Sequence, residues 1–499
     1  MTNNFDPYAT LGVSQSTTIE EVKRAYRKLA QRLHPDVNPN NPGANVQFQE
    51  ITAAYDILSD NIRRRHFDEE LSASRNEDDL FFSLRVTTSK RSIISLEESQ
   101  VIYMLAEILP PPQLRNDTAS AQSRINLTLV LDHSNSMNGV RLDKVKVAAH
   151  QIIDNLSDDD FISIVSFNDR ANAIIPATRV SDKQSLKAKV SLMSAFGGTE
   201  IYQGLSKGVL ENEKFMDSKM VNHVILLTDG HTFGDQDRCL ELANISANKG
   251  IGISAMGLGH DWNDEFLDEI ASKTGGSSIY ISSADAVVRF LNNHVRNLAN
   301  VFTERMKLSI ATNPDIQMEL AFKLSPHPQP LEIGGEYIHL GSLQTSRPIS
   351  ILMQYQLPAN MDLGFRNIVR LVATGDILQN SVSRFQAISD LEIEITKEQQ
   401  LEEPPPAILD ALSKLTLYRL QERAQQALEE GNIAEATKRL ENLATRLLEM
   451  GEDDLARQTR QEAQRVAQTM TFSDKGKKTI KYQTRYLLAP GTSIIDEIS

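Results

Sequence analysis

The first seventy residues carry two stripes of apolar side chains at helical spacing. The first stripe consists of Val22, Tyr26, Leu29 and Leu33, and the second consists of Phe48, Ile51, Tyr55 and Leu58. Thr17, followed three residues later by Glu20, predicts a capping-box start for the first helix. The loop HPDVNPNNPGA lies between the stripes and contains three prolines, which a helix interior does not tolerate. The pattern therefore predicts an all-α region over residues 5–70, with two antiparallel helices joined by a rigid loop.

The pattern of polar and apolar positions changes beyond this region. Residues 71–79 are polar and predict a linker, and residues 80–112 predict β-strands. Over residues 124–302, short apolar segments such as INLTLVL and NHVILLT alternate with helical segments such as DEFLDEIASK. Strands that are apolar on both faces are typical of a parallel sheet covered by helices. We therefore expect a doubly wound α/β domain over these residues.

The last third of the chain predicts a β-rich region followed by helices. Residues 306–395 contain strand patterns and turn signals without intervening helices, which favours a β-sandwich-like fold. Pairing with residues 80–112 would make the α/β domain an insertion in one sandwich. Residues 405–470 predict a helical hairpin or bundle with breaks at Gly431 and Gly451. Residues 471–499 form a tail that includes the basic segment KGKKTIKYQTRYLL, to which the pattern assigns no structure.

Composition narrows the classes of partner. The 499 residues carry a net charge of −14, which argues against nucleic acid as a partner, since a phosphate-binding surface needs clustered Lys and Arg. The single cysteine, Cys239, excludes an intrachain disulfide and a cysteine-rich zinc site. The chain shows no secretory-signal pattern at its start and no apolar run long enough for a membrane span. We therefore expect a cytoplasmic protein.

A stiff polar motif, His34-Pro35-Asp36, stands in the loop between the two predicted helices. The proline ring fixes its own φ and biases His34 toward an extended backbone. An imidazole and a carboxylate displayed in a stiff geometry lose little entropy when they bind a partner. A basic patch lies on the preceding helix, and such a patch is also typical of a plainly solvated helix face. Its residues are Lys23, Arg24, Arg27 and Lys28.

The context of this motif resembles the J-domain family along its full length. FDPYATLGV, EEVKRAYRKLAQRLHPDVNP, FQEITAAYDILSD and RRRHFD occur in that order. The resemblance implies that His34, Pro35, Asp36 and the basic helix bind a DnaK-type chaperone and accelerate its ATP hydrolysis. The chain lacks the Gly/Phe-rich segment and the CxxCxGxG repeats of the longest J proteins. We therefore expect the remainder of the chain to select the client.

A second set of polar residues follows the strands of the predicted α/β domain. Asp132, Ser134 and Ser136 follow the strand INLTLVL, Thr199 lies in a Gly-rich loop, and Asp229 follows NHVILLT. Loops at the carboxyl ends of parallel strands meet beside the switch point of the sheet. Each motif alone is also typical of a helix cap or a turn. Together they provide hard oxygen ligands, which suit Mg²⁺ or Mn²⁺ and offer nothing soft to zinc or copper.

Residues 124–302 resemble the von Willebrand factor type A domain, and these five residues match its metal-ion-dependent adhesion site at every position. The resemblance implies that Ser134 and Ser136 contact the metal directly and Thr199 does so directly or through water. Asp132 and Asp229 would act largely through water. An acidic residue of a protein partner would complete the coordination shell. We expect His133 to face outward as an exposed loop residue.

Three functions are compatible with this combination. The first is an adaptor that grips an acidic partner through the metal and brings a DnaK-type chaperone to it. The alternative is an accessory subunit of a ring ATPase in complex remodelling or metal insertion, and the absence of a P-loop means that such a motor would be another protein. A metal-dependent hydrolase is the third, but the sequence contains no readable nucleophile–base arrangement. We expect an adaptor and no enzymatic activity.

Overall fold

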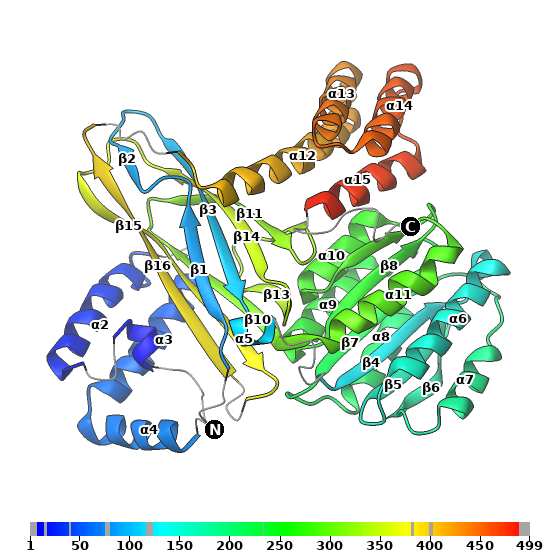
Figure 1. Cartoon of the computed structure of the whole chain (residues 1–499), viewed down its shortest axis with the longest axis horizontal. Coiled ribbons are helices and arrows are strands. Elements are labelled where there is room, and N and C mark those ends of the chain that lie inside the picture. Colours follow the sequence, from blue (N-terminus) through cyan, green and yellow to red (C-terminus); the bar gives the residue numbers. More distant parts are fainter. Residues whose placement is uncertain are drawn as a thin grey trace. The chain divides into compact units, whose positions relative to one another are not determined.

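The computed structural model describes residues 7–13, 17–38, 41–74, 80–115, 123–232, 234–380, 384–398 and 403–488. The chain forms two compact units (Figure 1). The first consists of Met1–Ser123, Asn300–Pro326 and Pro330–Leu409, and the second of Arg124–Ala299, His327–Gln329 and Asp410–Ser499. Each unit is therefore assembled from segments that lie far apart in the sequence.

Four helices open the first unit: α1 (Pro7–Leu11), α2 (Ile19–Leu33), α3 (Pro42–Leu58) and α4 (Asn61–Ser74). Their core includes Val22, Leu29 and Leu58, which are residues of the two apolar stripes. The capping box of α2 is one residue later than the sequence predicts. Thr18 Oγ1 accepts from Glu21 N at 3.4 Å and Glu21 Oε2 accepts from Thr18 N at 2.9 Å.

The polar segment expected to be a linker is partly helical. Helix α4 continues to Ser74, so residues 71–74 of the expected linker are helix. Residues 75–79 lie outside the described part of the chain. Tyr8 joins α1 to α4, because its hydroxyl donates to Asp68 Oδ1 at 2.7 Å and accepts from Arg64 Nε at 2.9 Å. Because α4 ends at Ser74, the helical region extends beyond residue 70, where its sequence pattern predicts the end.

A β-sandwich completes the first unit. One sheet has the order β1-β3-β14-β11-β12 and the other has the order β13-β10-β15-β16-β2. The strands before the α/β region are β1 (Ser83–Thr88), β2 (Ser92–Ile94) and β3 (Gln100–Leu109), which short helix α5 (Pro112–Arg115) follows. The strands after it are β10 (Val301–Thr312), β11 (Gln317–Ser325), β12 (Gln329–Pro330), β13 (Ile338–Gln344), β14 (Ile349–Leu357), β15 (Gly364–Ile377) and β16 (Arg384–Thr396). Since β3 pairs antiparallel with β14, the α/β region is inserted in the sequence of one sandwich.

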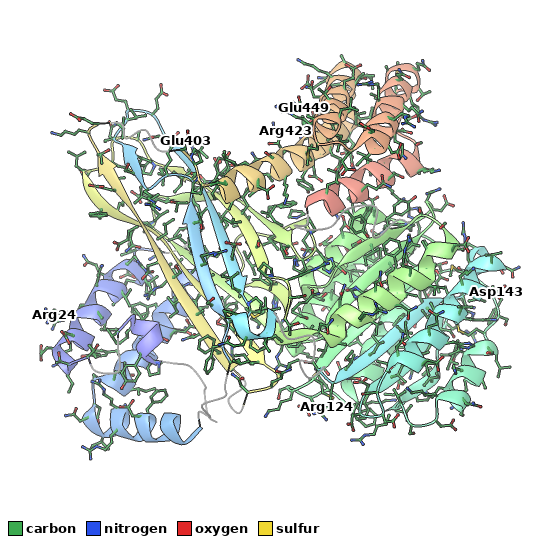
Figure 2. All side chains as sticks on the ribbon, in the orientation of Figure 1. Arg24, Arg124, Asp143, Glu403, Arg423 and Glu449 are labelled. Carbon is green, nitrogen blue, oxygen red and sulfur yellow. The ribbon has the colours of Figure 1, made fainter. Side chains whose placement is uncertain are left out.

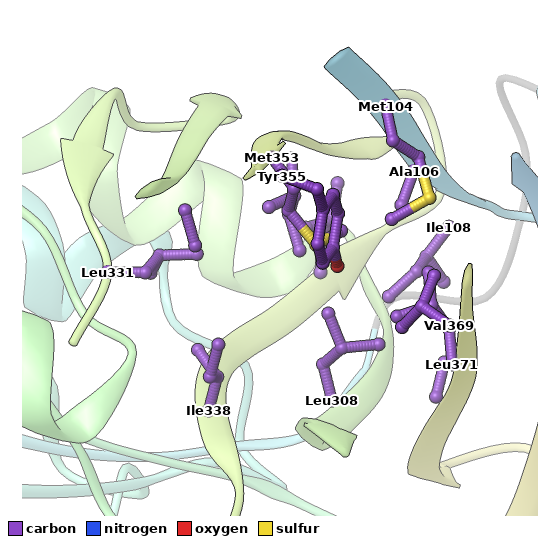
Figure 3. Close-up of a cluster of buried hydrophobic side chains, with 14 of the residues drawn as sticks. Met104, Ala106, Ile108, Leu308, Leu331, Ile338, Met353, Tyr355, Val369 and Leu371 are labelled. Atoms are coloured by element: carbon purple, nitrogen blue, oxygen red, sulfur yellow. The ribbon is translucent and has the colours of Figure 1, made fainter. Parts of the chain in front are cut away.

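Alternation of apolar and polar residues along the strands builds the sandwich core. Met104 and Ile108 of β3, together with Met353 and Tyr355 of β14, point into the space between the sheets. They meet apolar side chains of the opposite sheet, among them Leu308 of β10 (Figure 3). A strand period of two places every second residue on the inner face, which is the basis of sandwich packing.

Polar contacts connect the N-terminal helices to the sandwich within the same unit. Arg370 of β15 is buried and binds both oxygens of Asp390 at 3.0 Å. Asp390 Oδ1 also accepts from Arg32 of α2 at 2.9 Å. A buried hydrogen bond of 3.1 Å joins Gln47 of α3 to Ser309 of β10. The helical region is therefore held to the second sheet by paired and hydrogen-bonded groups.

The second unit is organised around a sheet of order β6-β5-β4-β7-β8-β9, in which every pair except β5–β6 is parallel. Helices α8, α9 and α10 cover one face, and α6, α7 and α11 cover the other (Figure 1). The strands are β4 (Ile125–Asp132), β5 (Phe161–Phe167), β6 (Ala171–Arg179), β7 (Val221–Thr228), β8 (Gly252–Leu258) and β9 (Ser278–Ile281). The helices are α6 (Val140–Asn155), α7 (Lys183–Ser191), α8 (Ile201–Glu213), α9 (Gln236–Lys249), α10 (Asp264–Thr274) and α11 (Ala284–Ala299).

The helices α12 (Pro406–Glu429), α13 (Ile433–Glu449), α14 (Asp453–Thr469) and α15 (Asp474–Leu488) end the described chain. The expectation of a multidomain chain with a helical start, a parallel α/β sheet, a strand-rich region and C-terminal helices is confirmed. Residues 474–488, which the sequence pattern left within a tail, are instead helix α15. Among the described helices, none combines the length and the apolar character needed to cross a bilayer.

The basic segment of α15 binds the acidic face of α10. Lys481 Nζ lies 2.5 Å from Asp264 Oδ2 and 2.8 Å from Asp268 Oδ2. Arg485 Nη2 also lies 2.8 Å from Asp268 Oδ2, and the Tyr482 hydroxyl donates to Asp268 Oδ1 at 2.8 Å. Burial acts to raise the pKa of Asp268, but Arg485 and Lys481 outweigh it and hold this pKa well below its ordinary value. The positive charge of this segment is therefore structural.

Replacement of Asp268 by alanine should destabilise the second unit by about 3 kcal/mol, because it leaves a buried cation without its carboxylate. Urea unfolding can be followed through the fluorescence of Trp262, the single tryptophan, whose ring centroid lies 5.8 Å from that of Tyr482. Asp154→Ala is the matched control, because Asp154 is 52% exposed in its pair with Lys187. The Asp154→Ala variant should lose less than about 1 kcal/mol of its free energy of unfolding. Equal losses in the two variants would contradict the structural role of α15.

Candidate functional site

The loop after α2 is fixed by hydrogen bonds on both sides of its proline. His34 ends the helix with φ −57° and ψ 136°, the extended backbone that a following proline favours. The carbonyl of His34 accepts from Val37 N at 3.0 Å and from Asn38 Nδ2 at 3.1 Å. Asn38 is buried and also donates to the Arg32 carbonyl at 2.7 Å. The loop is therefore a closed turn that is held by hydrogen bonds from its own residues.

This turn presents the three motif residues to solvent. His34, Pro35 and Asp36 are all exposed. The His34 ring is held edge-on to Phe48 of α3, with centroids 5.2 Å apart. Its Nδ1 accepts from the backbone N of Asp36 at 3.2 Å, and the Asp36 side chain is 89% exposed. The imidazole is thus oriented while the carboxylate remains open to a partner cation.

The basic residues of α2 differ in their engagement. Arg24 and Arg27 are exposed, and Arg24 lies at the outer surface of α2 (Figure 2). Lys23 Nζ lies 3.4 Å from Glu20, and Lys28 Nζ lies 3.6 Å from Glu392 of β16. The two arginines are therefore the members of this patch best placed for an external acidic surface.

The carboxyl ends of β4 and β7 lie side by side in the sheet of the second unit and bring two carboxylates together. Asp132 ends β4 and is fully buried. Its Oδ1 accepts from Ser134 N at 2.8 Å, and its Oδ2 accepts from the Thr228 hydroxyl at 2.6 Å. Burial raises the pKa of Asp132, against the hydrogen bonds of Thr228 and Ser134. Both of its oxygens are thus occupied, and its position is set by neutral donors.

The remaining predicted residues complete a compact cluster of oxygens. Ser134 Oγ and Ser136 Oγ lie 3.0 Å apart, and Ser136 Oγ donates to Asp229 Oδ1 at 2.6 Å. Thr199 lies against the loop that carries Asp229, because a Cβ placed on Gly230 would lie 3.3 Å from Thr199 Oγ1. The structure therefore brings together all five residues that the sequence assigned to a metal site.

The Gly-rich loop before α8 depends on its glycines. Gly197 has φ +81°, a conformation that glycine adopts without strain. Gly198 N donates to the Asp169 carboxylate at 3.1 Å, and a Cβ at this position would lie 2.5 Å from Asp169 Oδ1. The carbonyl of Gly197 also accepts from Asn135 N at 3.1 Å. These contacts fix the loop that carries Thr199 beside the loop that carries the serines.

The expectation that His133 is an exposed loop residue is wrong, and two further residues, Thr228 and Arg141, belong to the cluster. His133 is buried, its Nδ1 is 2.9 Å from the Ser194 carbonyl, and its ring lies edge-on to Phe196. Thr228 was missed, although a hydroxyl at the end of the apolar strand NHVILLT is a usable signal. Arg141 was missed as well, and its Nη1 lies 2.5 Å from Asp229 Oδ2. A lone arginine in the first turn of a helix carries no signal of this contact.

The donor set fits a hard divalent cation. Two carboxylates and three hydroxyls converge, and all of their donor atoms are oxygen. Among the described residues, no group of three or more His, Cys, Asp or Glu side chains could hold a metal by itself. A cation at this cluster would therefore depend on the serine and threonine hydroxyls, which softer metals do not favour.

Comparison with known families agrees with this division of the chain. Residues 6–68 match the DnaJ domain and residues 126–294 match the von Willebrand factor type A domain. Residues 406–490 match the Sll0103-like, C-terminal alpha-helical domain. Both resemblances inferred from the sequence motifs are thereby confirmed.

Individual relatives share only parts of the chain. Uncharacterized protein sll0103 of Synechocystis sp. is 32% identical over 241 residues, which are 47% of this chain and 57% of that protein. Chaperone protein DnaJ 1 of Mycobacterium tuberculosis is 52% identical over 64 residues, 13% of this chain and 16% of that protein. The chain thus spans little more than half of the first relative and a small part of the second.

Solved structures extend the likeness of fold beyond the α/β domain. A von Willebrand factor type A protein from Catenulispora acidiphila covers 82% of this chain and 98% of its own, with a TM-score of 0.66 and 14% identity. The ArnB paralog VWA2 from Sulfolobus acidocaldarius covers 83% and 99%, with a TM-score of 0.58 and 15% identity. At these identities the likeness concerns fold alone. The chain therefore joins an N-terminal DnaJ domain to a von Willebrand factor type A domain and an Sll0103-like helical domain.

Proposed function

We propose that this protein is a co-chaperone adaptor that stimulates the ATPase of a DnaK-type chaperone and recruits a protein partner through a metal-dependent site. The observation that carries the proposal is the closed, exposed His34-Pro35-Asp36 turn in a domain that matches the DnaJ family. A prearranged turn binds with a small entropy cost. The exposed arginines of α2 support binding to an acidic surface by steering.

In the type A domain, the proposed site binds Mg²⁺ or Mn²⁺. Ser134, Ser136 and Thr199 would supply hydroxyl oxygens, and Asp132 and Asp229 would supply the negative charge that holds the cation. A bound cation of this class keeps exchangeable water positions, and a carboxylate from a protein partner can fill one of them. As such an adaptor, the protein would catalyse no reaction of its own. It would act in the cytoplasm, together with a DnaK-type chaperone.

His34→Gln in the full chain should reduce its stimulation of a DnaK-type ATPase to the basal rate, because the oriented ring is lost while a polar side chain remains. The measurement is steady-state ATP hydrolysis by the chaperone at increasing concentrations of each variant. His150→Gln makes the same substitution in the type A domain, where His150 Nε2 lies 3.0 Å from the Lys187 carbonyl. This control should stimulate as the parent does. Full stimulation by His34→Gln would sink the assignment.

Asp132→Asn should weaken Mn²⁺ binding by about tenfold or more, because it removes a buried charge that supports the cation. Asparagine keeps the shape of the side chain, its oxygen can accept from Ser134 N, and its amide can donate to the Thr228 hydroxyl, so the fold should survive. Free Mn²⁺ is counted by electron paramagnetic resonance during titration of the full chain. Asp143→Asn is the control, because Asp143 is an exposed acid on α6 outside the oxygen cluster (Figure 2). Identical titrations for Asp132→Asn and the parent would remove these residues from the metal site.

A further inference from the structure

An arginine lies inside the oxygen cluster and binds one of its carboxylates. Arg141 is the second residue of α6, and its Nη1 lies 2.5 Å from Asp229 Oδ2 and 3.3 Å from the Ser136 carbonyl. The side chain of Asp229 is fully buried, whereas that of Arg141 is 38% exposed. Asp229 therefore has both oxygens occupied, one by the Ser136 hydroxyl and the other by a guanidinium.

The position of Arg141 conflicts with a second positive charge at the same carboxylate. A divalent cation at the serine hydroxyls needs the negative charge of Asp229, and the guanidinium already neutralises that charge. Two cations at one buried carboxylate repel each other strongly, because water screens them poorly there. One of them has to leave, or the affinity for the metal has to fall.

The surroundings of Arg141 give its side chain a way out. Helix α6 begins after Gly139, which has φ +79° and no heavy atom near the position of a Cβ. The neighbouring Val140 is 62% exposed. The guanidinium lies beside Gly259, where an added Cβ would be 3.4 Å from Nη2, and the Arg141 side chain is 38% exposed to solvent. A long side chain at an exposed helix start can therefore swing to solvent without a change in the fold.

We propose that Arg141 is a guard of the metal site that neutralises Asp229 when no metal is bound and has to leave Asp229 when a divalent cation binds. This inference rests on the proposed metal site. Arg141 thereby lowers the intrinsic affinity for metal and stabilises the metal-free domain. A residue with a purely structural role would show only the second effect.

The test uses Mn²⁺ alone and four variants of the full chain. Arg141→Met keeps an unbranched stem without the charge and should bind Mn²⁺ about tenfold more tightly than the parent. Arg141→Lys keeps the charge and should bind as the parent does. Lys144→Met removes a charge from the same helix, but Lys144 pairs with Asp285 at 2.8 Å, away from the cluster, so its affinity should be unchanged. Arg141→Met combined with Asp132→Asn should lose the added affinity, which assigns the gain to this site.

Thermal unfolding gives a second readout with opposite signs. Without metal, Arg141→Met should melt below the parent, because the buried Asp229 carboxylate has lost its cation. Saturating Mn²⁺ should raise its melting temperature by more than that of the parent, since a tighter ligand stabilises the folded state more.

The outcomes separate the two proposals. If the parent binds Mn²⁺ and Arg141→Met binds equally or less tightly, the guard role is wrong and the metal site stands. An equal gain in Lys144→Met would show a general charge effect and would also overturn the guard role. If neither the parent nor Arg141→Met binds Mn²⁺, the proposed metal site fails and the guard role fails with it.

Discussion

Aspartate carboxylates removed from water must find cations or hydrogen-bond donors, and this constraint organises the polar parts of both units. An unpaired buried charge costs more than most single contacts contribute. The same holds for a buried cation: Arg370 is buried and pairs with the partly exposed Asp390, which also binds Arg32, and this joins α2 to the sandwich. Asp268 meets it with Arg485, Lys481 and Tyr482, and this joins α15 to the α/β domain. Contacts that join distant segments are thus placed where a charged group, either a carboxylate or a guanidinium, is withdrawn from water.

The two carboxylates of the oxygen cluster meet the same requirement in different ways. Asp132 is satisfied by the Ser134 amide and the Thr228 hydroxyl, which are neutral donors at the carboxyl ends of β4 and β7. Asp229 is satisfied partly by Arg141, a charged group on a flexible stem at the surface. Neutral donors fix the orientation of the Asp132 carboxylate, whereas the Arg141 guanidinium at Asp229 can be replaced by another cation. Under the proposed exchange, Asp132 would be an anchor and Asp229 would be the carboxylate that changes its partner.

Local patterns in the sequence were sufficient for most of the elements and for placing the residues of both motifs in loops, because these depend on neighbours along the chain, but they left α15 unassigned. The proline after His34 dictates an extended backbone wherever the loop lies, and apolar strands with polar ends place Asp132 and Asp229 at one edge of the sheet. The capping box shifted by one residue because Thr17–Glu20 and Thr18–Glu21 have the same spacing, and local chemistry cannot choose between them.

Contacts across long sequence separations were not predictable in this way. Lys481 and Arg485 are four residues apart on α15, as Asp264 and Asp268 are on α10. Neither segment contains a local pattern that identifies the other as its partner. The same holds for Arg141 and Asp229, and for His133, whose burial depends on the distant Ser194 and Phe196. Basic and acidic segments are usually solvated, so charge alone does not single out the pairs that fold together.

The two motifs also differ in how much of their bound form exists before a partner arrives. The turn at His34 is closed by its own backbone and by the buried Asn38, so the groups proposed to bind a chaperone are arranged by the chain itself. In the oxygen cluster Arg141 already binds Asp229, so the proposed use of this site for a partner would require an exchange first. If both proposals hold, the chaperone-binding turn is constantly available while partner capture depends on the metal. The adaptor would then be controlled in the type A domain, where the Arg141 guanidinium and a divalent cation compete for the buried Asp229 carboxylate.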